Sequence, residues 1–451
     1  MTTLEKSSLE VLREALEVLD SGFNALPDHS PLPDLGALRE VLLATAERLQ
    51  DNYPYQHPLY AGQMLKPPHP IARLAYMLAM WINPNNHALD GGRASSAMEK
   101  EAVAQIAAMF GWQTHLGHLC GGGTIANLEG LWVASRLHPG QKIVASAQAH
   151  YTHSRLCGVL GIPFETVATD QRARMDIAAL EKLLESGEIG TVVVTLGTTA
   201  TGSVDPLPAV LSLRERYGFR IHVDTAYGGY FTLVDNLDAP ARAAFDQIHQ
   251  ADSIAIDPHK HGLQPYGCGC ILFKDPAIGT LYQHDSPYTY FTSDELHLGE
   301  ITLECSRAGA AAVGLWATQR LLPLEGGGVF AGELSQARDA ARALHQRLAN
   351  DSRFLAPFAP ELDIVVWAID GENASQASQR AHAVFDACAA QHLHLALVKL
   401  PASLLPDTAI EWDQETITCL RSCLMKPEHL AWLDPIWTIL DQATASVYST
   451  S

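Results

Sequence analysis

The centre of the chain alternates short apolar runs with longer amphipathic stretches. Short apolar runs bounded by turn residues are typical of buried strands. The runs predict strands at residues 142–146, 191–195, 220–223, 253–256 and 270–273. Helical periodicity at 177–185 and 207–216 separates several of these runs. An alternation of this kind predicts an α/β fold, with a mostly parallel sheet covered by helices on both faces.

Helical patterns also flank this central region. Residues 9–19 and 38–49 predict two amphipathic helices, and the Pro- and Tyr-rich residues 53–70 predict an irregular arm. After a glycine-rich break at 325–328, the pattern again predicts helices and strands in turn. These later elements are helices at 330–348 and 374–391 and strands at 362–369, 393–400 and 417–424.

With 451 residues, the chain is longer than a single hydrophobic core usually supports. We therefore expect an N-terminal helical and arm segment at 1–85, a large domain at 86–325 and a small C-terminal α/β domain at 330–451. Hydrophobic residues make up 47% of the chain and charged residues 18%, which is typical of a folded protein rather than a disordered one.

The charge of the chain narrows the range of partners. Asp and Glu number 50 against 30 Lys and Arg, so the formal net charge is −20. A field of this sign repels phosphate backbones and anionic lipids, so neither nucleic acid nor a membrane is an expected partner. The longest apolar stretch, near residues 74–82, is shorter than the roughly 20 residues that cross a bilayer.

Cysteine usage and the start of the chain predict a cytoplasmic protein. Eight cysteines without a dense spacing pattern are typical of free thiols in a reducing compartment. Residues 1–19 are charged and amphipathic, unlike the apolar core of a secretory signal. Cys268 and Cys270 lie in an apolar strand, so we interpret them as core residues, and no metal site is expected.

Two chemically active groups lie at the ends of neighbouring predicted strands. Asp224 follows the strand at 220–223, and Lys260 lies shortly after the strand at 253–256. Sheets of this architecture bind ligands at the carboxyl ends of their strands. A lysine and a carboxylate placed there suit a pyridine aldehyde cofactor. The amine can form an imine with the aldehyde, and the carboxylate can pair with the pyridinium nitrogen.

A glycine-rich turn supplies the third requirement of such a cofactor, which is a phosphate site. The segment Gly121-Gly122-Gly123-Thr124 precedes the helical pattern at 125–137. Glycines let the backbone approach a phosphate closely, and a helix N-terminus favours an anion. Together with the lysine and the carboxylate, this turn predicts a binding site for pyridoxal 5′-phosphate.

In order and spacing, these segments and several others resemble the group II pyridoxal-phosphate-dependent amino-acid decarboxylases, relatives of glutamate, aromatic-amino-acid and bacterial tyrosine decarboxylases. The resemblance covers most of the chain. It implies the type I fold of these enzymes, similar to aspartate aminotransferase, with a seven-stranded sheet in the large domain. It also implies a homodimer with active sites at the subunit interface. The matching segments are His57-Pro58 with Gln63, Asn83-Pro84-Asn85-Asn86, Gly122-Gly123-Thr124 with Ala126-Asn127, Gln148-Ala149-His150, Gly197-Thr198-Thr199, residues 222–229, residues 257–262, Ser306-Arg307-Ala308-Gly309 and Leu420-Arg421.

The resemblance implies a position around the cofactor ring for five side chains. Lys260 would hold the cofactor, and Asp224 would meet the ring nitrogen. His150 would lie flat over the ring and Ala226 would pack beneath it, while Thr199 would contact the polar edge of the ring. Of these residues, Lys260, His150 and Asp224 would be catalytic.

The resemblance also implies residues for the cofactor's phosphate. Gly123, Thr124 and His259 would bind it within one subunit. Ser306 would reach the phosphate of the neighbouring subunit.

Two further residues match positions that face the substrate in glutamate decarboxylase. They are Gln63 and Arg421, and an arginine fork suits a carboxylate. Many relatives carry Asn in place of Asp257, and an Asp there is more similar to the bacterial tyrosine decarboxylases. We therefore expect an aromatic, tyrosine-like substrate or an acidic one similar to glutamate or aspartate.

Residues 282–298 are rich in Tyr, His, Ser and Asp and predict a loop. In the family, a tyrosine on such a loop crosses to the partner's site and protonates the product carbon. Tyr288 aligns best with that tyrosine and would be catalytic, and Tyr290 is the alternative.

The expected reaction is decarboxylation of an L-amino acid to a primary amine and carbon dioxide. Two alternatives stay open at this point. The first is a pyridoxal-phosphate-dependent lyase or aldolase of the same fold, which would cleave another carbon–carbon bond. The second is a non-catalytic homologue, against which the presence of Lys260, Asp224 and His150 argues.

Overall fold

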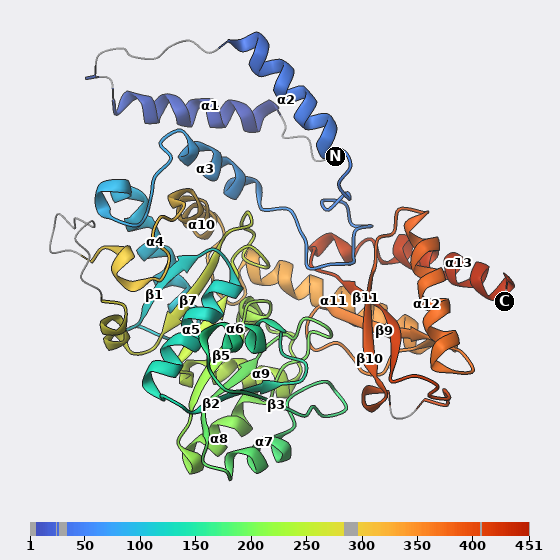
Figure 1. Ribbon diagram of the computed structural model, residues 1–451. Helices are drawn as coiled ribbons and strands as arrows, with labels where there is room; N and C mark the ends of the chain where they lie inside the picture. Colours follow the sequence, from blue (N-terminus) through green and yellow to red (C-terminus); the bar gives the residue numbers. More distant parts are fainter. Residues whose placement is uncertain (1–5, 24, 27–33, 284–295, 406–407, 451) are drawn as a thin grey trace.

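The computed structural model describes residues 6–23, 25–26, 34–283, 296–405 and 408–450. A sheet of seven strands forms the centre of the larger part of the molecule (Figure 1). Its order is β1-β7-β6-β5-β4-β2-β3, and β7 runs antiparallel to both of its neighbours while the other pairs are parallel. The predicted mostly parallel sheet is confirmed. Its strands are β1 (Leu116–Cys120), β2 (Lys142–Ser146), β3 (Phe164–Val167), β4 (Ile189–Thr195), β5 (Arg220–Thr225), β6 (Ser253–Ile256) and β7 (Gly269–Phe273).

The apolar pattern does not predict β1 and β3, which lie at the two edges of this sheet. β1 contains Gly117 and His118, which interrupt its apolar sequence, and only Val167 of β3 is buried. An edge strand has one neighbouring strand instead of two, so it carries fewer obligatory apolar residues.

Alternate residues of the central strands point to opposite faces of the sheet, and helices cover both faces. In β4, Val192 and Val194 join the core formed with α4, α7, α8 and α9, whereas Val193 packs with α5 and α6. A sheet buried on both faces explains why its strands appear as continuous apolar runs in the sequence. The covering helices are α4 (Leu89–Met109), α5 (Gly123–Leu137), α6 (Thr152–Leu160), α7 (Ile177–Leu184), α8 (Leu207–Tyr217) and α9 (Ala239–Asp246).

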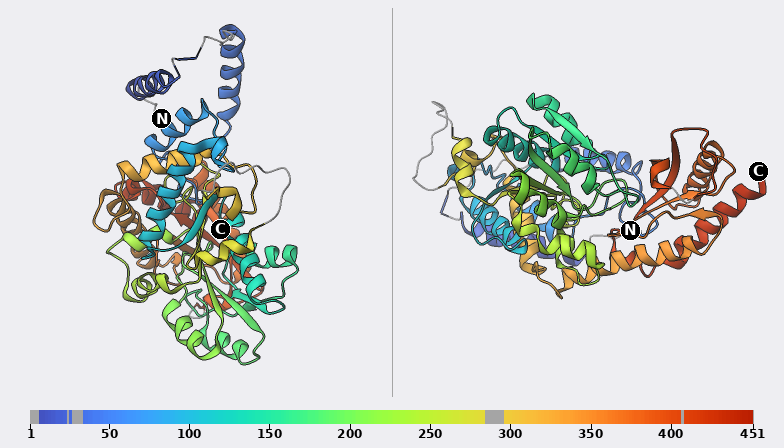
Figure 2. Two further views of the ribbon diagram at one scale, coloured as in Figure 1. Left: turned by 90° about the vertical axis from the view of Figure 1, so that its left-hand side faces the viewer. Right: turned by 90° about the horizontal axis from the view of Figure 1, so that it is seen from below.

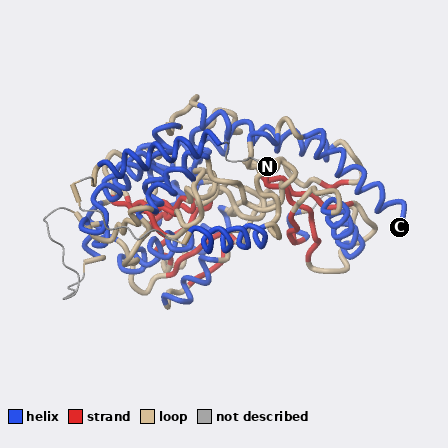
Figure 3. The backbone as a smooth tube through the Cα atoms, turned by 90° about the horizontal axis from the view of Figure 1, so that it is seen from above, coloured by secondary structure: helices blue, strands red, loops and turns tan. Residues whose placement is uncertain are grey.

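A second, antiparallel sheet of four strands follows, in the order β10-β11-β9-β8. Val365 and Trp367 of β9 pack against the helices α11, α12 and α13, while Val366 and Ala368 face the core shared with the large sheet. Figure 2 shows α11 extending from the large sheet along the small one, and Figure 3 shows helices flanking the strands of both sheets. The elements are α11 (Val329–Ala349), β8 (Phe354–Leu355), β9 (Ile364–Ile369), α12 (Ala374–Ala389), β10 (Ala396–Pro401), β11 (Thr416–Cys423) and α13 (Leu433–Thr450).

The N-terminal helices α1 (Lys6–Ser21) and α2 (Leu35–Leu49) extend away from the two sheets (Figure 1). The predicted arm then runs back along the small sheet, where Tyr60 pairs with His394. The chain next enters α3 (Pro70–Met80), which packs on α10 (Gly309–Leu321). No helix among the described residues is long and apolar enough to cross a membrane. Short 3₁₀ helices complete the fold: η1 (Gly229–Leu233), η2 (Ile248–Gln250), η3 (Pro276–Leu281), η4 (Leu298–Ile301), η5 (Ala402–Leu404) and η6 (Pro427–His429).

Candidate active site

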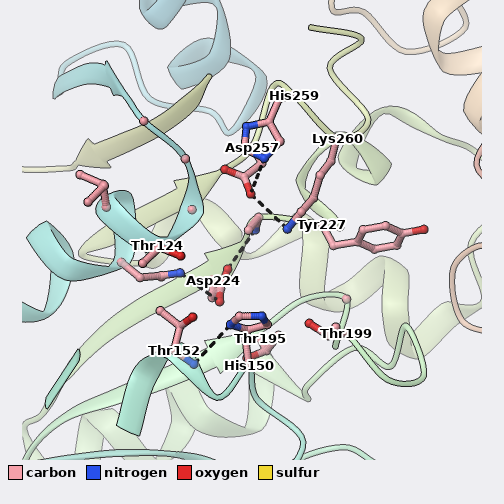
Figure 4. A pocket seen from close by; sticks show the side chains of 17 residues that line it. Thr124, His150, Thr152, Thr195, Thr199, Asp224, Tyr227, Asp257, His259 and Lys260 are labelled. Atoms are coloured by element: carbon pink, nitrogen blue, oxygen red, sulfur yellow. Dashed lines mark hydrogen bonds and ion pairs between the residues drawn. The ribbon is translucent and has the colours of Figure 1, made fainter. Parts of the chain in front are cut away.

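The carboxyl ends of several parallel strands meet at one cavity of about 290 Å³ (Figure 4). Because β1, β2, β4, β5 and β6 run in the same direction, the segments that follow them lie at the same edge of the sheet. Most of the predicted site residues line this cavity, namely Gly123, Thr124, His150, Thr199, Asp224, Ala226, His259 and Lys260. The fold thus brings residues from well-separated parts of the sequence into one place.

The glycine turn after β1 forms a cradle at one wall of the cavity. Gly122 has a φ of +147°, a conformation that strongly favours glycine. A Cβ on Gly269 would lie 2.5 Å from backbone atoms of Gly122, so only glycine permits this approach. No described side chain caps α5, which leaves the first N–H groups of the helix for another acceptor. The cradle therefore fits the phosphate of pyridoxal phosphate.

Lys260, His259 and Asp257 lie on one side of the pocket and His150 on the other, with Asp224 between them (Figure 4). The Nζ of Lys260 is 3.1 Å and the Nε2 of His259 is 3.5 Å from Oδ2 of Asp257. Burial and the nearby charge of Lys260 lower the pKa of His259, so its ring is neutral at neutral pH. Nδ1 of His259 and Oδ1 of Asp257 are buried without hydrogen-bond partners among the described residues, so a ligand can occupy them.

Three hydrogen bonds hold the carboxylate of Asp224. Its Oδ2 accepts from Nε2 of His153 at 2.9 Å and from Nδ2 of Asn127 at 3.3 Å. Its Oδ1 accepts from the backbone N–H of Ala226 at 3.0 Å. Burial alone would raise the pKa of Asp224, but the bonds from His153 and Ala226 and the charge of Lys260 bring this pKa well below its ordinary range. The side chain is therefore an ionised partner suited to a pyridinium nitrogen.

A chain of hydrogen bonds continues behind Asn127. Its Oδ1 is 2.8 Å from Nε2 of His222, and Nδ1 of His222 is 2.8 Å from Oγ of Ser253. Burial lowers the pKa of His222 to about 3, so the ring is neutral and carries a single proton. An ionised Asp224 only accepts hydrogen bonds, so Asn127 presents its amide N–H to Asp224 and its carbonyl to His222. The proton of His222 therefore sits on Nε2, and Ser253 donates to Nδ1.

His150 and the end of β4 form the wall opposite Lys260. Nδ1 of His150 accepts a hydrogen bond from the backbone N–H of Thr152 at 3.3 Å, which helps to orient the ring. Burial and the charge of Lys260 lower the pKa of His150, so the ring is neutral near pH 7. Thr195 lines the same wall, and its buried hydroxyl has no partner among the described residues.

Sequence reasoning misses several residues of the site. Asn127 lies one helical turn after Gly123, and Thr195 is the last residue of a predicted strand. Both positions therefore predict a side chain near the site. The short helix α6 was not predicted, and for that reason its inward-facing side chains were not recognised. The missed residues are Thr152, His153 and Thr195, together with Asn127, Tyr227 and Asp257, whose motifs were noted without a role.

Gln63 and Arg421 contact each other next to the cavity, although neither is among the described residues that line it. Arg421 donates from NH2 to Oε1 of Gln63 at 2.5 Å and from NH1 to the carbonyl of Thr199 at 3.0 Å. In the small sheet, Arg421 is paired with Val366, whose side chain faces the large sheet. The register of β11 therefore directs Arg421 toward the predicted cofactor site.

Two other predicted residues are not in this cavity. Ser306 is exposed, and its hydroxyl accepts a hydrogen bond from Nδ2 of Asn85 at 3.1 Å. Its predicted contact with the phosphate of a neighbouring subunit stays a prediction. Tyr288 and Tyr290 lie outside the described residues.

Comparison with known proteins shows which family shares this arrangement. Residues 55–370, more than half of the chain, match the pyridoxal-dependent decarboxylase conserved domain. The chain belongs to the pyridoxal-dependent decarboxylase family. This match confirms the predicted family and the predicted cofactor, pyridoxal phosphate. It also confirms the predicted enzyme class, a carboxy-lyase that acts on amino acids.

Individual relatives of this decarboxylase differ in the substrates that their names give. It is 27% identical to an L-tyrosine decarboxylase of Enterococcus faecium over 78% of this chain and 75% of the relative. It is 32% identical to a probable L-aspartate decarboxylase of Halobacterium salinarum over 58% of this chain and 70% of the relative. The crystal structure of Catharanthus roseus tryptophan decarboxylase superposes with a TM-score of 0.74 at 16% identity, covering 99% of this chain and 100% of the other. That likeness confirms the predicted type I fold.

Proposed function

We propose that this decarboxylase converts an L-amino acid to its primary amine and carbon dioxide on a cofactor held by Lys260. The observation that carries the proposal is the meeting of Lys260, Asp224, His150 and the glycine turn in one cavity. When bound, pyridoxal phosphate supplies a sink for the electron pair that the departing carboxylate leaves behind. The alternative reading as a lyase for another carbon–carbon bond has no comparable support.

Each side chain around the ring has a distinct task in this proposal. Asp224 stays ionised and keeps a proton on the ring nitrogen, which deepens the electron sink. His150, being neutral, would cover one face of the ring without competing for that charge, and Ala226 would pack on the other. Thr199, which lines the cavity, would contact the polar edge of the ring.

The phosphate site combines backbone and side-chain donors. No described side chain caps α5, so the N–H groups of Gly123 and Thr124 at its start would donate to the phosphate together with the side chain of His259. The helix dipole adds a favourable field for the anion in a chain whose net charge is −20.

Arg421 and Gln63 are the proposed substrate-binding residues. Arg421 is 6% exposed, and its hydrogen bonds to Thr199 and Gln63 go to neutral acceptors, so its charge is available to a substrate carboxylate. The names of the relatives support both an aromatic, tyrosine-like substrate and an acidic, aspartate-like or glutamate-like one. If Arg421 binds the carboxylate of an acidic side chain, Arg421→Met should raise the KM for acidic substrates alone.

The proposal is tested by incubating the purified holoenzyme with the twenty amino acids and a set of acidic analogues. We expect stoichiometric carbon dioxide and amine from an aromatic or an acidic substrate. Borohydride reduction followed by peptide mapping should place the cofactor on Lys260. A cofactor mapped to another lysine, or a product that retains the α-carboxylate, would contradict the proposal.

Tyr288 is the proposed proton donor to the product carbon. We expect Tyr288→Phe to release carbon dioxide but to form little amine, because the hydroxyl that would protonate the product carbon is missing. Dissolved oxygen would then oxidise the unprotonated product, and aldehyde, ammonia and hydrogen peroxide would appear in place of the amine. Amine and aldehyde yields per carbon dioxide are compared in Tyr288→Phe and Tyr290→Phe. An unchanged ratio in the first variant removes Tyr288 from the mechanism, and a change only in the second assigns the role to Tyr290.

We also propose a homodimer whose active sites lie at the subunit interface, completed by Ser306 of the partner subunit. Helix α2 has no buried residue, although Leu35, Val41 and Leu42 are 71%, 65% and 59% exposed. An apolar helix face of this kind requires a covering surface, and a second copy supplies one. A catalytically active monomer in sedimentation at assay concentration would exclude the dimer.

A cytoplasmic location completes the proposal. All eight cysteines are free thiols, as expected in a reducing compartment. Fractionation of cells that produce the protein tests this location.

A further inference from the structure

His153 is a buried histidine to which the proposed mechanism assigns no task. Its side chain is 1% exposed, and its Nε2 lies 2.9 Å from Oδ2 of Asp224. Its Nδ1 is buried and has no hydrogen-bond partner among the described residues. The hydrogen bond to Asp224 is therefore the polar contact that defines this side chain.

We propose that His153 is a positioning residue that holds Asp224 ionised and aimed at the cofactor, so that the ring nitrogen keeps its proton. The inference rests on the proposed role of Asp224. It adds a residue that acts through Asp224 and does not itself touch the cofactor.

The direction of the hydrogen bond follows from the chemistry of the two groups. An ionised carboxylate only accepts, so the shared proton sits on Nε2 of His153. Nδ1 has no hydrogen-bond partner among the described residues, so the contact with Asp224 is the side-chain hydrogen bond that orients this ring. The N–H of His153 stabilises the ionised form of Asp224, which is the form that the ring nitrogen requires.

The remaining contacts of Asp224 support this assignment. His153 and Asn127 share Oδ2. Among the described residues, Oδ1 accepts only from the backbone of Ala226, so it retains capacity for a further donor. Two donors on one oxygen fix the rotation of the carboxylate and also favour its ionised form.

The titratable groups that face Asp224 are three histidines and one lysine: His150, His153, His222 and Lys260. His150 and His222 are neutral near pH 7, because burial lowers the pKa of each. Lys260 is the group that would join the cofactor. Once Lys260 is joined to the cofactor, the hydrogen-bond donors of the scaffold have to maintain the orientation of Asp224. Of the three hydrogen bonds to Asp224, the one from His153 is the shortest.

The decisive experiment compares His153→Leu with His153→Gln. Leucine fills a similar volume without a donor, whereas the glutamine amide can place an N–H near the position of Nε2. Each purified variant is loaded with pyridoxal phosphate labelled with ¹⁵N in the ring, and the nitrogen chemical shift is recorded from about pH 6 to about pH 9. Asp224→Asn serves as the reference. His345→Leu is the matched control, because it makes the same substitution at a half-buried histidine in α11.

We expect a protonated ring nitrogen throughout in the parent enzyme, in His153→Gln and in His345→Leu. In His153→Leu the ring should lose its proton within the pH range, as in Asp224→Asn. The turnover number of His153→Leu should fall about tenfold to a hundredfold, as for the loss of a hydrogen bond to a charged group, with little change in KM. In the Asp224→Asn background, the leucine substitution should have no further effect.

Two outcomes would overturn the role of His153. A ring nitrogen that stays protonated in His153→Leu but not in Asp224→Asn shows that Asp224 needs no help from His153. Proton loss in both His153 variants, with an equal drop in their unfolding temperatures, assigns the residue to packing. A protonated ring in Asp224→Asn contradicts the proposed role of Asp224 itself, so the two failures are distinguishable.

Discussion

Asp224 lies near the end of β5 and Asp257 directly follows the neighbouring strand β6; both face the same cavity, yet their surroundings differ in kind. Asp224 accepts three hydrogen bonds, from His153, Asn127 and a backbone N–H. Asp257 instead lies beside Lys260 and His259, and its Oδ1 has no hydrogen-bond partner among the described residues.

The difference indicates how the two carboxylates would respond when the cofactor binds. The partners of Asp224 belong to the protein scaffold, so its geometry is set before any ligand arrives. The partners of Asp257 are the two residues proposed to hold the cofactor, so its contacts have to change on loading. One pocket would then contain a carboxylate with fixed contacts, Asp224, for the ring and a carboxylate whose contacts change, Asp257, beside the lysine.

The largest effect that tests this comparison is expected from Asp224→Asn. The amide keeps the shape of the side chain but removes the charge that keeps the ring nitrogen protonated. We expect turnover to fall about a thousandfold, or about 4 kcal/mol in the barrier, with an unchanged unfolding temperature. Single-turnover rates measure the effect, and Asp246→Asn at an exposed carboxylate is the control. Turnover within a few-fold of the parent enzyme would mean that another group pairs with the ring.

A smaller effect is expected from Asp257→Asn. The amide can still contact Lys260 and His259, and it removes a negative charge next to the proposed phosphate site. We expect turnover within about tenfold of the parent enzyme and cofactor binding that is equal or tighter, since a lost charge repulsion is worth a few kcal/mol at most. Titration of the apoenzyme with pyridoxal phosphate measures the affinity. If Asp257→Asn is as inactive as Asp224→Asn, the two carboxylates do not differ as described.

A third effect concerns stability in acid, not turnover, and lies in the scaffold behind Asp224. His222 has a pKa of about 3 in the folded protein, far below that of an exposed histidine. Between about pH 3 and about pH 6.5 the unfolded chain binds a proton at this position that the folded chain does not, so His222 makes stability decrease as the pH falls. His222→Gln removes this contribution, which is about 1.4 kcal/mol per pH unit. Denaturant unfolding at several acidic pH values should show a shallower loss in the variant, and parallel curves would contradict it.

Much of the fold follows from the order of residues alone. The central strands are continuous apolar runs because both faces of the sheet are buried, so β2, β4, β5, β6 and β7 were recognisable. The edge strands β1 and β3 were not, since Gly117 and His118 in β1 and exposed positions in β3 weaken the pattern. The helices α11 and α12 and the three main strands of the small sheet were also predicted from their periodicity.

The sequence by itself determined which groups are chemically active. A lysine, a carboxylate and a glycine turn placed after strands of a parallel sheet predict the cofactor, because such strands end at one edge. The tertiary structure decided how those groups are supported. Arg421 reaches Thr199 across 222 residues because of the register of β11. His153 reaches Asp224 because α6 packs on the sheet near the end of β5. Hydrogen bonds between distant segments depend on tertiary packing of this kind, and such packing leaves no periodic signal in the sequence.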